Sequence, residues 1–335
     1  MRAWLLPAGT DGFDKLDQDT LPDPEPGPGE VVVAPKAWSI NYRDFVVASG
    51  KYMGGPLTRP GVPLSDGAGE VVAVGQGVTS VKVGDKVQSS FFPEWVEGPP
   101  RRGGPALGDG HVAGMLAELV ALPATGVVPI AETLDFSQAA CMPCAGVTAW
   151  NALHEGPRAL KPGERVLVLG SGGVSMIALQ IARASGCEVI ATSSSDEKLE
   201  RIRALGAAHT INYKAVPEWG AHIAQTYGGV DKVIEVGGAG TTAQSMAALR
   251  MQGEIAFIGM LSPEGGPNPR ALMLAGGMMR GIFVGSAAMA KALNAAVDVN
   301  GIQPVIGKRF GFDQAKDAYA HAWGPDSFGK TVIEL

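Results

Sequence analysis

The apolar positions of the chain follow two different patterns that meet near residue 123. Residues 1–122 hold short β-branched runs separated by proline and glycine, a pattern typical of β-rich domains. These runs predict strands at Val31–Ala37, Glu70–Val74, Val81–Val87 and Met115–Leu122. Between them, Pro93–Gly110 predicts a long surface loop of a kind that often carries function.

From residue 123 onward, apolar runs alternate with helix-compatible segments, which predicts a parallel, doubly wound sheet with right-handed crossovers. The predicted strands are Arg165–Leu169, Glu188–Thr192, Thr210–Tyr213, Lys232–Val236, Ile255–Met260 and Ile282–Val284, with helices over Asp196–Leu205, Glu218–Tyr227 and Thr242–Met251. A last helix (Asp313–Trp323) and strand (Lys330–Leu335) are expected to return to the N-terminal domain. We therefore predict one domain from residues 1–122 and 288–335, and another from residues 123–287.

Composition and charge exclude several classes of protein. The chain has 335 residues, of which 46% are hydrophobic and 18% charged, so it can bury a sizeable core. The net charge of -6 and the lack of a basic run give no case for nucleic acid. Residues 271–290 are apolar, but Arg280 and several glycines interrupt them, which favours a buried strand after a helix over a membrane span. The three cysteines form no disulfide framework and the N-terminus is not a signal peptide, so we expect a cytoplasmic protein.

A glycine turn follows the first strand of the second domain. The apolar run Val166–Leu169 stops at Gly170, small residues continue to Ser175, and an apolar helix begins. Strand, glycine turn and helix together aim a helix N-terminus at a phosphate, and Gly172 lets the backbone approach a pyrophosphate. Ser175 stands at the third glycine position of the fingerprint. The turn predicts a bound dinucleotide that contacts Gly170, Gly172, Gly173 and Val174.

The end of the next strand indicates which dinucleotide binds. Sites for NAD carry an acidic residue about 20 positions beyond the glycines, and this chain has Ser193 there. Ser193, Ser194 and Lys198 are able to donate to a 2′-phosphate, so we predict NADPH as the cofactor. An alternative explanation stays open, because Ser194 and Glu197 have the spacing of a helix capping box.

Further cofactor contacts are expected where later strands end, because ligands of such sheets lie outside the carboxyl ends of the strands. These positions are Val236, Gly237, Gly259, Met260 and Leu261. They are expected to contact the cofactor mostly through their backbone.

Several motifs together resemble the medium-chain dehydrogenase/reductase superfamily. They are the glycine turn, Ser39–Asp44 (Ser-Ile-Asn-Tyr-Arg-Asp), Asp66–Val71, Val83–Val87 and Phe328–Ile333. The resemblance runs nearly end to end and is strongest to the zinc-free, quinone oxidoreductase-like branch. It implies an α/β fold with a GroES-like β-rich catalytic domain, formed by both chain ends, and a Rossmann domain between them.

The resemblance also implies partners and contacts. Thr148 matches a threonine at the nicotinamide face and Tyr213 matches a phosphate or adenine contact, although a small core residue would look like Thr148. Phe283 and Val284 are further candidates for cofactor contact. They lie within Gly281–Ser286, which resembles the edge strand through which family members form homodimers. The implied substrate is a small carbonyl, alkene or quinone.

Zinc is tested by the residues at the family's ligand positions. Zinc-binding members place a cysteine where this chain has Asn41, a histidine at Ser65, a glutamate at Asp66 and a cysteine at Cys144. One thiol and one carboxylate make a poor zinc site, so no metal is expected. Cys141 and Cys144 have redox spacing, but buried structural thiols explain them better.

Without zinc, conjugate reduction needs only a hydrogen-bond donor for the developing enolate oxygen and a proton for the α-carbon. Asn41, in place of a zinc ligand, is the expected donor, unless it is a backbone-capping asparagine. Tyr52 stands where enoyl reductases of the family carry a tyrosine donor, unless it is only an aromatic plug. We predict an NADPH-dependent reductase of an activated alkene or quinone. The alternatives are an alcohol dehydrogenase on the same fold and a non-catalytic NADPH-binding protein.

Overall fold

The structure is a computed structural model that describes residues 1–53, 55–101, 104–259, 261 and 269–335. Its contacts divide the chain into two compact units, residues Met1–Val147 with Val284–Leu335 (unit 1) and Thr148–Phe283 (unit 2). The first boundary falls later than residue 123, since strand β7 (Val127–Pro129) pairs with β5 (Lys86–Ser89) of unit 1. The second boundary falls at Val284, slightly before residue 288. A change of composition near residue 123 therefore precedes the structural boundary.

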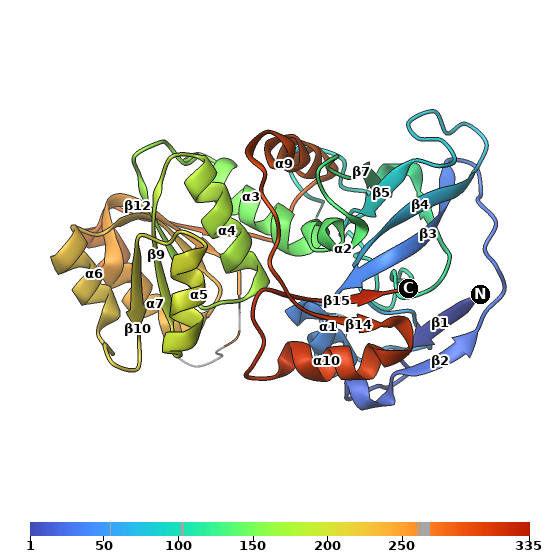
Figure 1. Ribbon diagram of the computed structural model, residues 1–335, viewed down its shortest axis with the longest axis horizontal. Helices are drawn as coiled ribbons and strands as arrows, with labels where there is room; N and C mark the ends of the chain where they lie inside the picture. Colours follow the sequence, from blue (N-terminus) through green and yellow to red (C-terminus); the bar gives the residue numbers. More distant parts are fainter. Residues whose placement is uncertain (54, 102–103, 260, 262–268) are drawn as a thin grey trace. The chain divides into compact units, whose positions relative to one another are not determined.

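Unit 1 is built on a seven-stranded sheet in the order β14-β15-β3-β4-β5-β7, with β6 paired to β3. Its remaining strands are β3 (Glu30–Ser39), β4 (Asp66–Val74), β6 (Val120–Pro123), β14 (Ile306–Gly311) and β15 (Lys330–Glu334). β15 runs antiparallel to β3, with Val332 opposite Ser39. The expected return of the C-terminal tail is therefore confirmed, and Figure 1 shows β15 beside β3.

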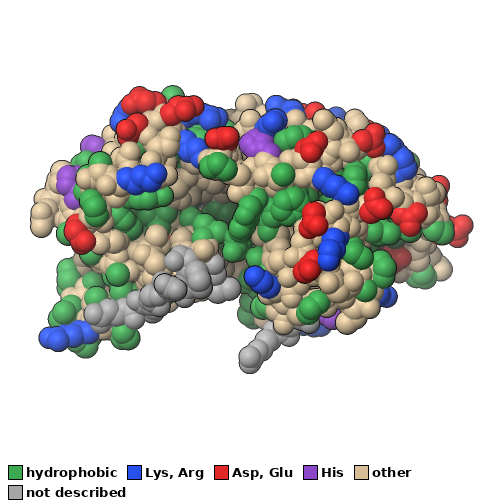
Figure 2. All heavy atoms as spheres, turned by 90° about the horizontal axis from the view of Figure 1, so that it is seen from below, with side chains coloured by type: hydrophobic (Ala, Val, Ile, Leu, Met, Phe, Trp, Pro, Cys, Tyr) green, Lys and Arg blue, Asp and Glu red, His purple; other side chains and the backbone are tan. Residues whose placement is uncertain are grey.

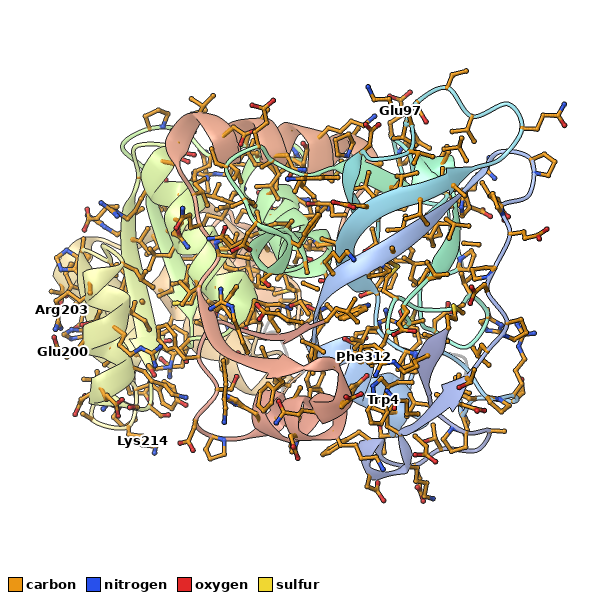
Figure 3. All side chains as sticks on the ribbon, turned by 45° about the vertical axis from the view of Figure 1, so that its right-hand side comes forward. Trp4, Glu97, Glu200, Arg203, Lys214 and Phe312 are labelled. Atoms are coloured by element: carbon orange, nitrogen blue, oxygen red, sulfur yellow. The ribbon has the colours of Figure 1, made fainter. Side chains whose placement is uncertain are left out.

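The C-terminal segment also completes the core of unit 1. Trp4, on strand β1 (Arg2–Leu5), packs against Phe312 with ring centroids 6.5 Å apart, and its indole N–H donates to the Phe312 carbonyl at 2.9 Å. Figure 3 shows these two residues together, although they stand at opposite ends of the sequence. Strand β2 (Asp17–Thr20) pairs with β1, and the helices are α1 (Tyr42–Ala48), α2 (Phe136–Ala139), α9 (Ala287–Asn300) and α10 (Ala315–Trp323).

Unit 2 is a six-stranded parallel sheet in the order β10-β9-β8-β11-β12-β13. Its strands are β8 (Arg165–Leu169), β9 (Glu188–Ser193), β10 (His209–Asn212), β11 (Val230–Glu235), β12 (Leu249–Phe257) and β13 (Met278–Gly281). The helices are α3 (Val147–His154, from the last residue of unit 1), α4 (Gly173–Ala184), α5 (Asp196–Ala204), α6 (Trp219–Tyr227), α7 (Ala239–Ala248) and α8 (Pro269–Leu274). Figure 1 shows helices along the sheet, which is the doubly wound architecture that the alternating pattern predicts.

Some element boundaries differ from the prediction for local reasons. The predicted strand Val81–Val87 begins only at Lys86, because the Asp85 carboxylate accepts from the Lys82 N–H at 2.9 Å and closes a turn. The helix predicted to reach Met251 ends at Ala248, and Leu249 opens β12 by pairing with Val230.

Two further predicted strands occupy different residues in the structure. The strand predicted over Met115–Leu122 is confined to β6 (Val120–Pro123). The strand predicted at Ile282–Val284 lies earlier, as β13, and its residues are half-buried or exposed because β13 is the edge of the sheet. An edge strand lacks a second neighbour, so its pattern of apolar residues is a weak guide to its bounds.

The surface carries charges of both signs, as expected from a chain with 27 basic and 33 acidic residues. Figure 2 shows acidic and basic side chains interspersed on the face that it presents. Among the described residues, none of the helices combines the length and apolar character needed to span a lipid bilayer.

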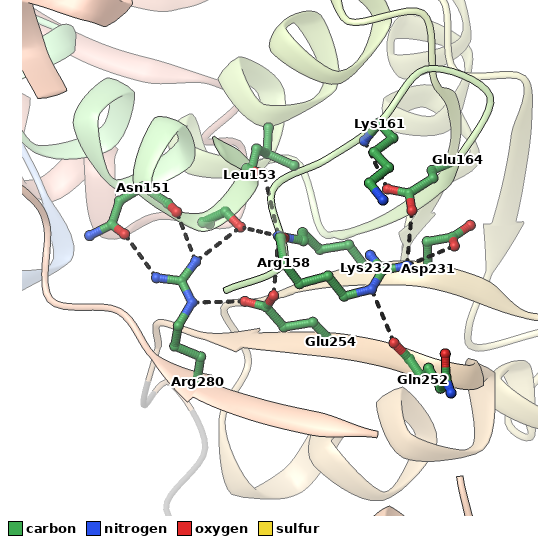
Figure 4. A network of polar contacts seen from close by, with 11 residues as sticks. Asn151, Leu153, Arg158, Lys161, Glu164, Asp231, Lys232, Gln252, Glu254 and Arg280 are labelled. Atoms are coloured by element: carbon green, nitrogen blue, oxygen red, sulfur yellow. Dashed lines mark hydrogen bonds and ion pairs between the residues drawn. The ribbon is translucent and has the colours of Figure 1, made fainter. Parts of the chain in front are cut away.

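Unit 2 contains a buried polar network beneath its sheet, drawn in Figure 4. Lys232 of β11 is fully buried and its ammonium lies 3.3 Å from the Glu254 carboxylate of β12. The other Glu254 oxygen pairs with Arg280 of β13 at 2.9 Å, and Arg280 donates to Asn151 of α3. The network therefore joins three adjacent strands to one helix.

Candidate active site

Asn41 is the N-cap residue of α1 and forms a capping box with Asp44 across the first turn. The backbone N–H of Asn41 donates to the Asp44 carboxylate at 2.8 Å, so the first turn is held from the Asp44 side chain. The Asn41 Oδ1 atom also accepts from the Lys330 ammonium at 2.5 Å. Asn41 therefore stands at a capping position, as the alternative explanation expects, and its side chain is held by Lys330 as well.

Lys330 begins β15 and is only 4% exposed. Its Nζ also donates to the Ile40 carbonyl at 2.7 Å. An ammonium can only donate, so the oxygen of the Asn41 amide must face it and the nitrogen must face away. The Asn41 Nδ2 atom is buried and completes no hydrogen bond among the described residues.

Asp66, the first residue of β4, is buried beside these groups. Its two oxygens accept from the Ser65 hydroxyl at 2.7 Å and from the Cys144 N–H at 3.1 Å. Burial raises the pKa of Asp66 above its usual value, while the charge of Lys330 and the approach of the Asn41 amide act in the opposite direction. The amide of Asn41 thus lies between a cation and a carboxyl group.

These residues do not fit a zinc ion. Ser65 and Asn41 offer neutral oxygen or nitrogen atoms, and the Lys330 ammonium already holds the Asn41 oxygen. Burial and the nearby Asp66 raise the pKa of the Cys144 thiol. In the part of the chain that the structure describes, no group of three or more His, Cys, Asp or Glu side chains is arranged to hold a metal.

Cys141 and Cys144 are free thiols. Cys141 directly precedes a π-helical turn, Met142–Gly146, and Cys144 lies within that turn. Burial raises the pKa of Cys141 to about 12, and its Sγ donates to the Ser137 carbonyl. Reactive cysteines have lowered pKa values, so the raised values here favour structural thiols over a reactive pair.

Tyr52 follows α1 and packs at the edge of the core of unit 1. The Arg43 guanidinium stacks on its ring at 5.6 Å from the centroid and on the ring of Phe91 at 4.8 Å. Arg43 is held by a hydrogen bond from its Nη2 to the Leu107 carbonyl. Burial raises the pKa of Tyr52, and the positive charge of Arg43 partly offsets that rise.

Asp44 is a second buried carboxyl group of this cluster. It is 1% exposed and lies 3.6 Å from the Arg43 guanidinium. Burial raises the pKa of Asp44 to about 6, although Arg43 and the Asn41 N–H favour the ionised form. A buried carboxyl group with a pKa in this range is typical of functional sites.

The glycine turn of unit 2 has the geometry expected of it. Gly170 follows β8 with a φ of +71°, which favours glycine, and its N–H donates to the Thr192 carbonyl at 2.8 Å. Gly172 is the N-cap of α4, which begins with Gly173 and Val174. Ser175, at the third fingerprint position, is buried and donates to the Leu169 carbonyl at 2.6 Å. The serine hydroxyl therefore ties the helix to the strand where a glycine would only allow close packing.

The residues that we expect to contact a 2′-phosphate lie at and after the end of β9. Ser193 is 3% exposed, and its carbonyl accepts from the N–H of Tyr213, whose side chain is 41% exposed. The capping role at α5 falls to Ser195, whose hydroxyl accepts from the Lys198 N–H at 3.3 Å. Helix capping therefore does not account for Ser194.

Glu235 holds the turn after β11 with its side chain, and its carbonyl accepts from the N–H groups of Ile258 and Gly259 after β12 at 2.9 and 3.1 Å. One oxygen of this buried carboxylate accepts from the N–H groups of Gly237 and Gly238 at 2.8 and 3.0 Å. Gly259 lies so close to the end of β11 that an added Cβ would stand 1.8 Å from the Val236 carbonyl oxygen. Leu261 is 55% exposed, and Met260 lies outside the described residues.

The remaining candidates lie around the chain segments that join the units. Thr148 is 2% exposed on α3, and Phe283 is 47% exposed. Val284 is buried with a φ of +54°, a strained conformation for a β-branched residue. Such strain is often retained at functional sites, although it assigns no role by itself.

The sequence analysis missed Lys330 and Arg43 as site residues, although both stand inside the motifs that it used. The signal for Lys330 is a lysine next to a glycine in an otherwise apolar strand, Phe328–Ile333, where the sheet must bury it. Arg43 gave no signal, since the contacts that bury it come from Phe91 and Leu107, far along the chain.

Comparisons with known proteins agree with this architecture. Residues 27–132 match the model of an alcohol dehydrogenase GroES-like domain, and residues 173–298 match that of a zinc-binding dehydrogenase. A zinc-type alcohol dehydrogenase-like protein of Schizosaccharomyces pombe is 43% identical over 97% of this chain and 96% of its own length.

Solved structures extend the similarity to the whole fold. A Sinorhizobium meliloti protein described as an alcohol dehydrogenase has a TM-score of 0.89 at 38% identity, covering all of both chains. A structure described as an NAD-dependent alcohol dehydrogenase has a TM-score of 0.87 at 31% identity, also over all of both chains. With a GroES-like domain, a Rossmann-like parallel sheet and a full-length relative, the chain belongs to the medium-chain dehydrogenase/reductase superfamily.

Proposed function

We propose that this oxidoreductase is an NADPH-dependent reductase that transfers hydride to an activated alkene (enone or enoyl) or to a quinone without zinc. The observation that carries the proposal is the state of Asn41. Its oxygen is held by Lys330 at 2.5 Å, while its buried nitrogen completes no hydrogen bond among the described residues. A donor that is held in place and shielded from water is what a developing oxyanion requires.

The chemistry assigns a role to each side chain. NADPH, when bound, supplies hydride for the β-carbon of the substrate. Asn41 donates an N–H to the substrate oxygen as it gains enolate character. Tyr52 gives a proton to the α-carbon, and the adjacent Arg43 charge stabilises the tyrosinate that remains.

The residues of unit 2 fit a dinucleotide. The N–H groups of Gly173 and Val174 open α4 at the turn where a pyrophosphate would lie. Ser193, Ser194, Lys198 and Tyr213 gather where β9 and β10 end, and none of them would repel a 2′-phosphate. Thr148, Gly237 and Gly259 would contact the nicotinamide end. These features support NADPH over NADH.

An alcohol dehydrogenase is the competing function, and the names of the relatives favour it. The two functions differ in their dependence on metal. Asn41, Ser65, Asp66 and Cys144 are a weak donor set for zinc, which supports the reductase. Turnover of alcohols that is lost to a chelator and restored by zinc would establish the competing function instead.

Two measurements test the proposal. Thermal shift with NADPH and NADH should give the larger stabilisation with NADPH, because a ligand of the native state raises apparent stability. A panel of enones, enoyl thioesters, quinones, aldehydes and alcohols should then show NADPH oxidation with alkenes or quinones that is insensitive to chelators. Binding of NADPH without turnover of any panel member would point to a non-catalytic protein.

The variants Asn41→Ala and Tyr52→Phe test the assigned residues. Loss of one oxyanion donor lowers kcat by roughly 10²–10³-fold in other enzymes, and we expect a fall of that order for Asn41→Ala. Unchanged turnover in both variants would refute the site. We also propose a homodimer that pairs through Gly281–Ser286, the segment that begins where the edge strand β13 ends; light scattering of the purified protein would test it.

A further inference from the structure

We propose that Lys330 is a positioning residue of the reaction, which acts by fixing the orientation of the Asn41 amide and strengthening its N–H as a donor. The catalytic part of this inference rests on the proposed function, the reduction of an activated alkene or quinone. The contact between the two side chains is given by the structure itself, since the Lys330 Nζ donates to Asn41 Oδ1 at 2.5 Å.

The neighbours of Asn41 allow only one orientation of its amide. The Lys330 ammonium is a donor without acceptor capacity, and it already bonds the oxygen of the amide. A rotation of the amide by 180° would set its nitrogen against the ammonium and lose this hydrogen bond.

The hydrogen bond also polarises the amide. A charged donor on the oxygen withdraws electron density from the nitrogen, so the N–H groups become better donors, as in any chain of hydrogen bonds. An amide carries two N–H groups, so one is available to a substrate oxygen even while the other approaches Asp66. Lys330 therefore acts on the substrate through Asn41, without touching it.

The backbone, not the lysine side chain, sets the position of Lys330. Gly329 has a φ of +65°, and an added Cβ would stand 2.2 Å from the Val305 carbonyl oxygen. The same carbonyl accepts from the Lys330 N–H at 2.8 Å, and Val332 pairs with Ser39 across the sheet. Replacement of the lysine side chain should therefore leave β15 in place.

Lys232 shows what a structural buried lysine looks like in the same protein. Its ammonium lies 3.3 Å from Glu254 and donates to the carbonyls of Ala152, Leu153 and Arg158. Those partners are a carboxylate and backbone groups within one buried network. Lys330 differs because one of its hydrogen bonds goes to the neutral side chain of the candidate donor.

A double-mutant cycle tests the inference in the full-length protein. We expect Lys330→Met to lower kcat by about tenfold to a hundredfold, below the loss of a whole oxyanion donor, with the KM for NADPH changed by less than about twofold. Lys330→Arg, which keeps a donor and its charge, should recover part of kcat. In the Asn41→Ala background, adding Lys330→Met should lower kcat by a further factor of less than about two. Losses that multiply, or full activity of Lys330→Met, would overturn the inference.

Controls separate positioning from folding. Lys308→Met changes an exposed lysine of the neighbouring strand β14, whose Cα pairs with that of Thr331, and should leave kcat unchanged. If Lys330→Met fails to fold, Asn41→Asp serves instead, because it keeps an oxygen for Lys330 but has no N–H donor. It should be as inactive as Asn41→Ala, and an active Asn41→Asp would overturn the inference.

One readout does not depend on turnover. In protein labelled with ¹⁵N-asparagine, the side-chain amide pair that disappears in Asn41→Ala should shift in Lys330→Met and stay near its wild-type position in Lys330→Arg. If the wild-type protein reduces none of the panel substrates, the proposed function is wrong. The NMR measurement still tests the Lys330–Asn41 contact in that case, because it does not depend on turnover. An amide pair that is the same with and without the lysine would refute the contact.

Discussion

The guanidinium of Arg43 stacks on the ring of Tyr52, 5.6 Å from its centroid. Replacing Arg43 by Met should raise the pKa of Tyr52 further, because burial already raises that pKa and the Arg43 charge opposes the rise. Tyrosinate absorbance against pH, taken as the difference from Tyr52→Phe, measures the shift. Arg43→Lys keeps the charge and should lie closer to wild type. An identical titration in Arg43→Met would show that the two side chains are not coupled.

Asp44 should make the protein less stable as the pH rises from about 4 to about 6. Burial raises the pKa of Asp44 from its usual 3.8 to about 6, so the folded state binds a proton that the unfolded state has lost. The stability from the protonated form is complete below about pH 4 and is lost as pH rises through about 6, by roughly 3 kcal/mol.

Urea unfolding of wild type and Asp44→Asn over this pH range measures the effect. Wild type should lose stability relative to Asp44→Asn as the pH rises from about 4 through about 6, and the difference should level off about one unit higher. Asp66 also has a raised pKa, so its titration destabilises the folded state in the same direction. Because Asp66, Arg43 and Lys330 are present in both proteins, the difference in unfolding free energy reports mainly on Asp44. A difference that does not depend on pH would contradict the expected titration.

Ser193→Asp should shift the cofactor preference from NADPH toward NADH by about tenfold or more, since about 1.4 kcal/mol is a tenfold change. A carboxylate at the end of β9 would repel a 2′-phosphate and accept from ribose hydroxyls. Ratios of kcat/KM for the two cofactors measure the shift. Ser195→Ala is the control, because Ser195 only caps α5 and its loss should cost about 1 kcal/mol of stability without changing the ratio.

Lys232→Met should destabilise the protein by about 3–5 kcal/mol, because removing one partner of a buried pair leaves the other uncompensated. The loss is moderated by Arg280, which remains paired with Glu254 at 2.9 Å. An exposed pair gives the comparison: Glu200 and Arg203, labelled in Figure 3, lie 2.5 Å apart, and Arg203→Ala should cost less than about 1 kcal/mol. If Lys232→Met and Arg203→Ala lowered the unfolding free energy equally, burial of the ion pair would not determine the size of the loss.

Gly329→Ala should destabilise the protein by more than Gly301→Ala does. The two glycines have φ values of +65° and +63°, so both changes carry the strain of a left-handed residue, about 1–2 kcal/mol. Only at Gly329 would the new Cβ meet a backbone atom, the Val305 oxygen at 2.2 Å, because nothing lies within 4 Å at Gly301. Denaturant midpoints of the two variants measure the difference. Similar midpoints would show that β15 can shift, and the Lys330 contact with it.

The parts of the fold that repeat along the sequence could be predicted from it. Buried parallel strands such as β8 and β9 are continuous apolar runs between turns, and their predicted bounds are close to those observed. The two-unit organisation followed from the change of pattern, but its boundary did not, because β7 belongs to unit 1 only through pairing with β5. Pairing between distant segments leaves no local trace in the sequence.

Candidate site residues could be named from the sequence only where a single residue carries the chemistry. Gly170, Ser193 and Asn41 stand at positions whose residue type is informative by itself. Lys330 becomes informative only beside Asn41, to which a hydrogen bond joins it across 289 positions of sequence. The buried state of Asp44, which sets its pKa, likewise depends on side chains that the sequence does not place.

Unit 1 is formed by chain segments that come before and after unit 2 in the sequence, and this order has a consequence for biosynthesis. A chain is made from its N-terminus, and early segments begin to fold while later ones are still being added. Asn41, Asp66 and Cys144 are all present before unit 2 is translated, but Lys330 follows the whole of it. A nascent chain would therefore hold the Asn41 amide without the cation that orients it. Reductase activity should appear on the ribosome only after the last strand has emerged from the exit tunnel.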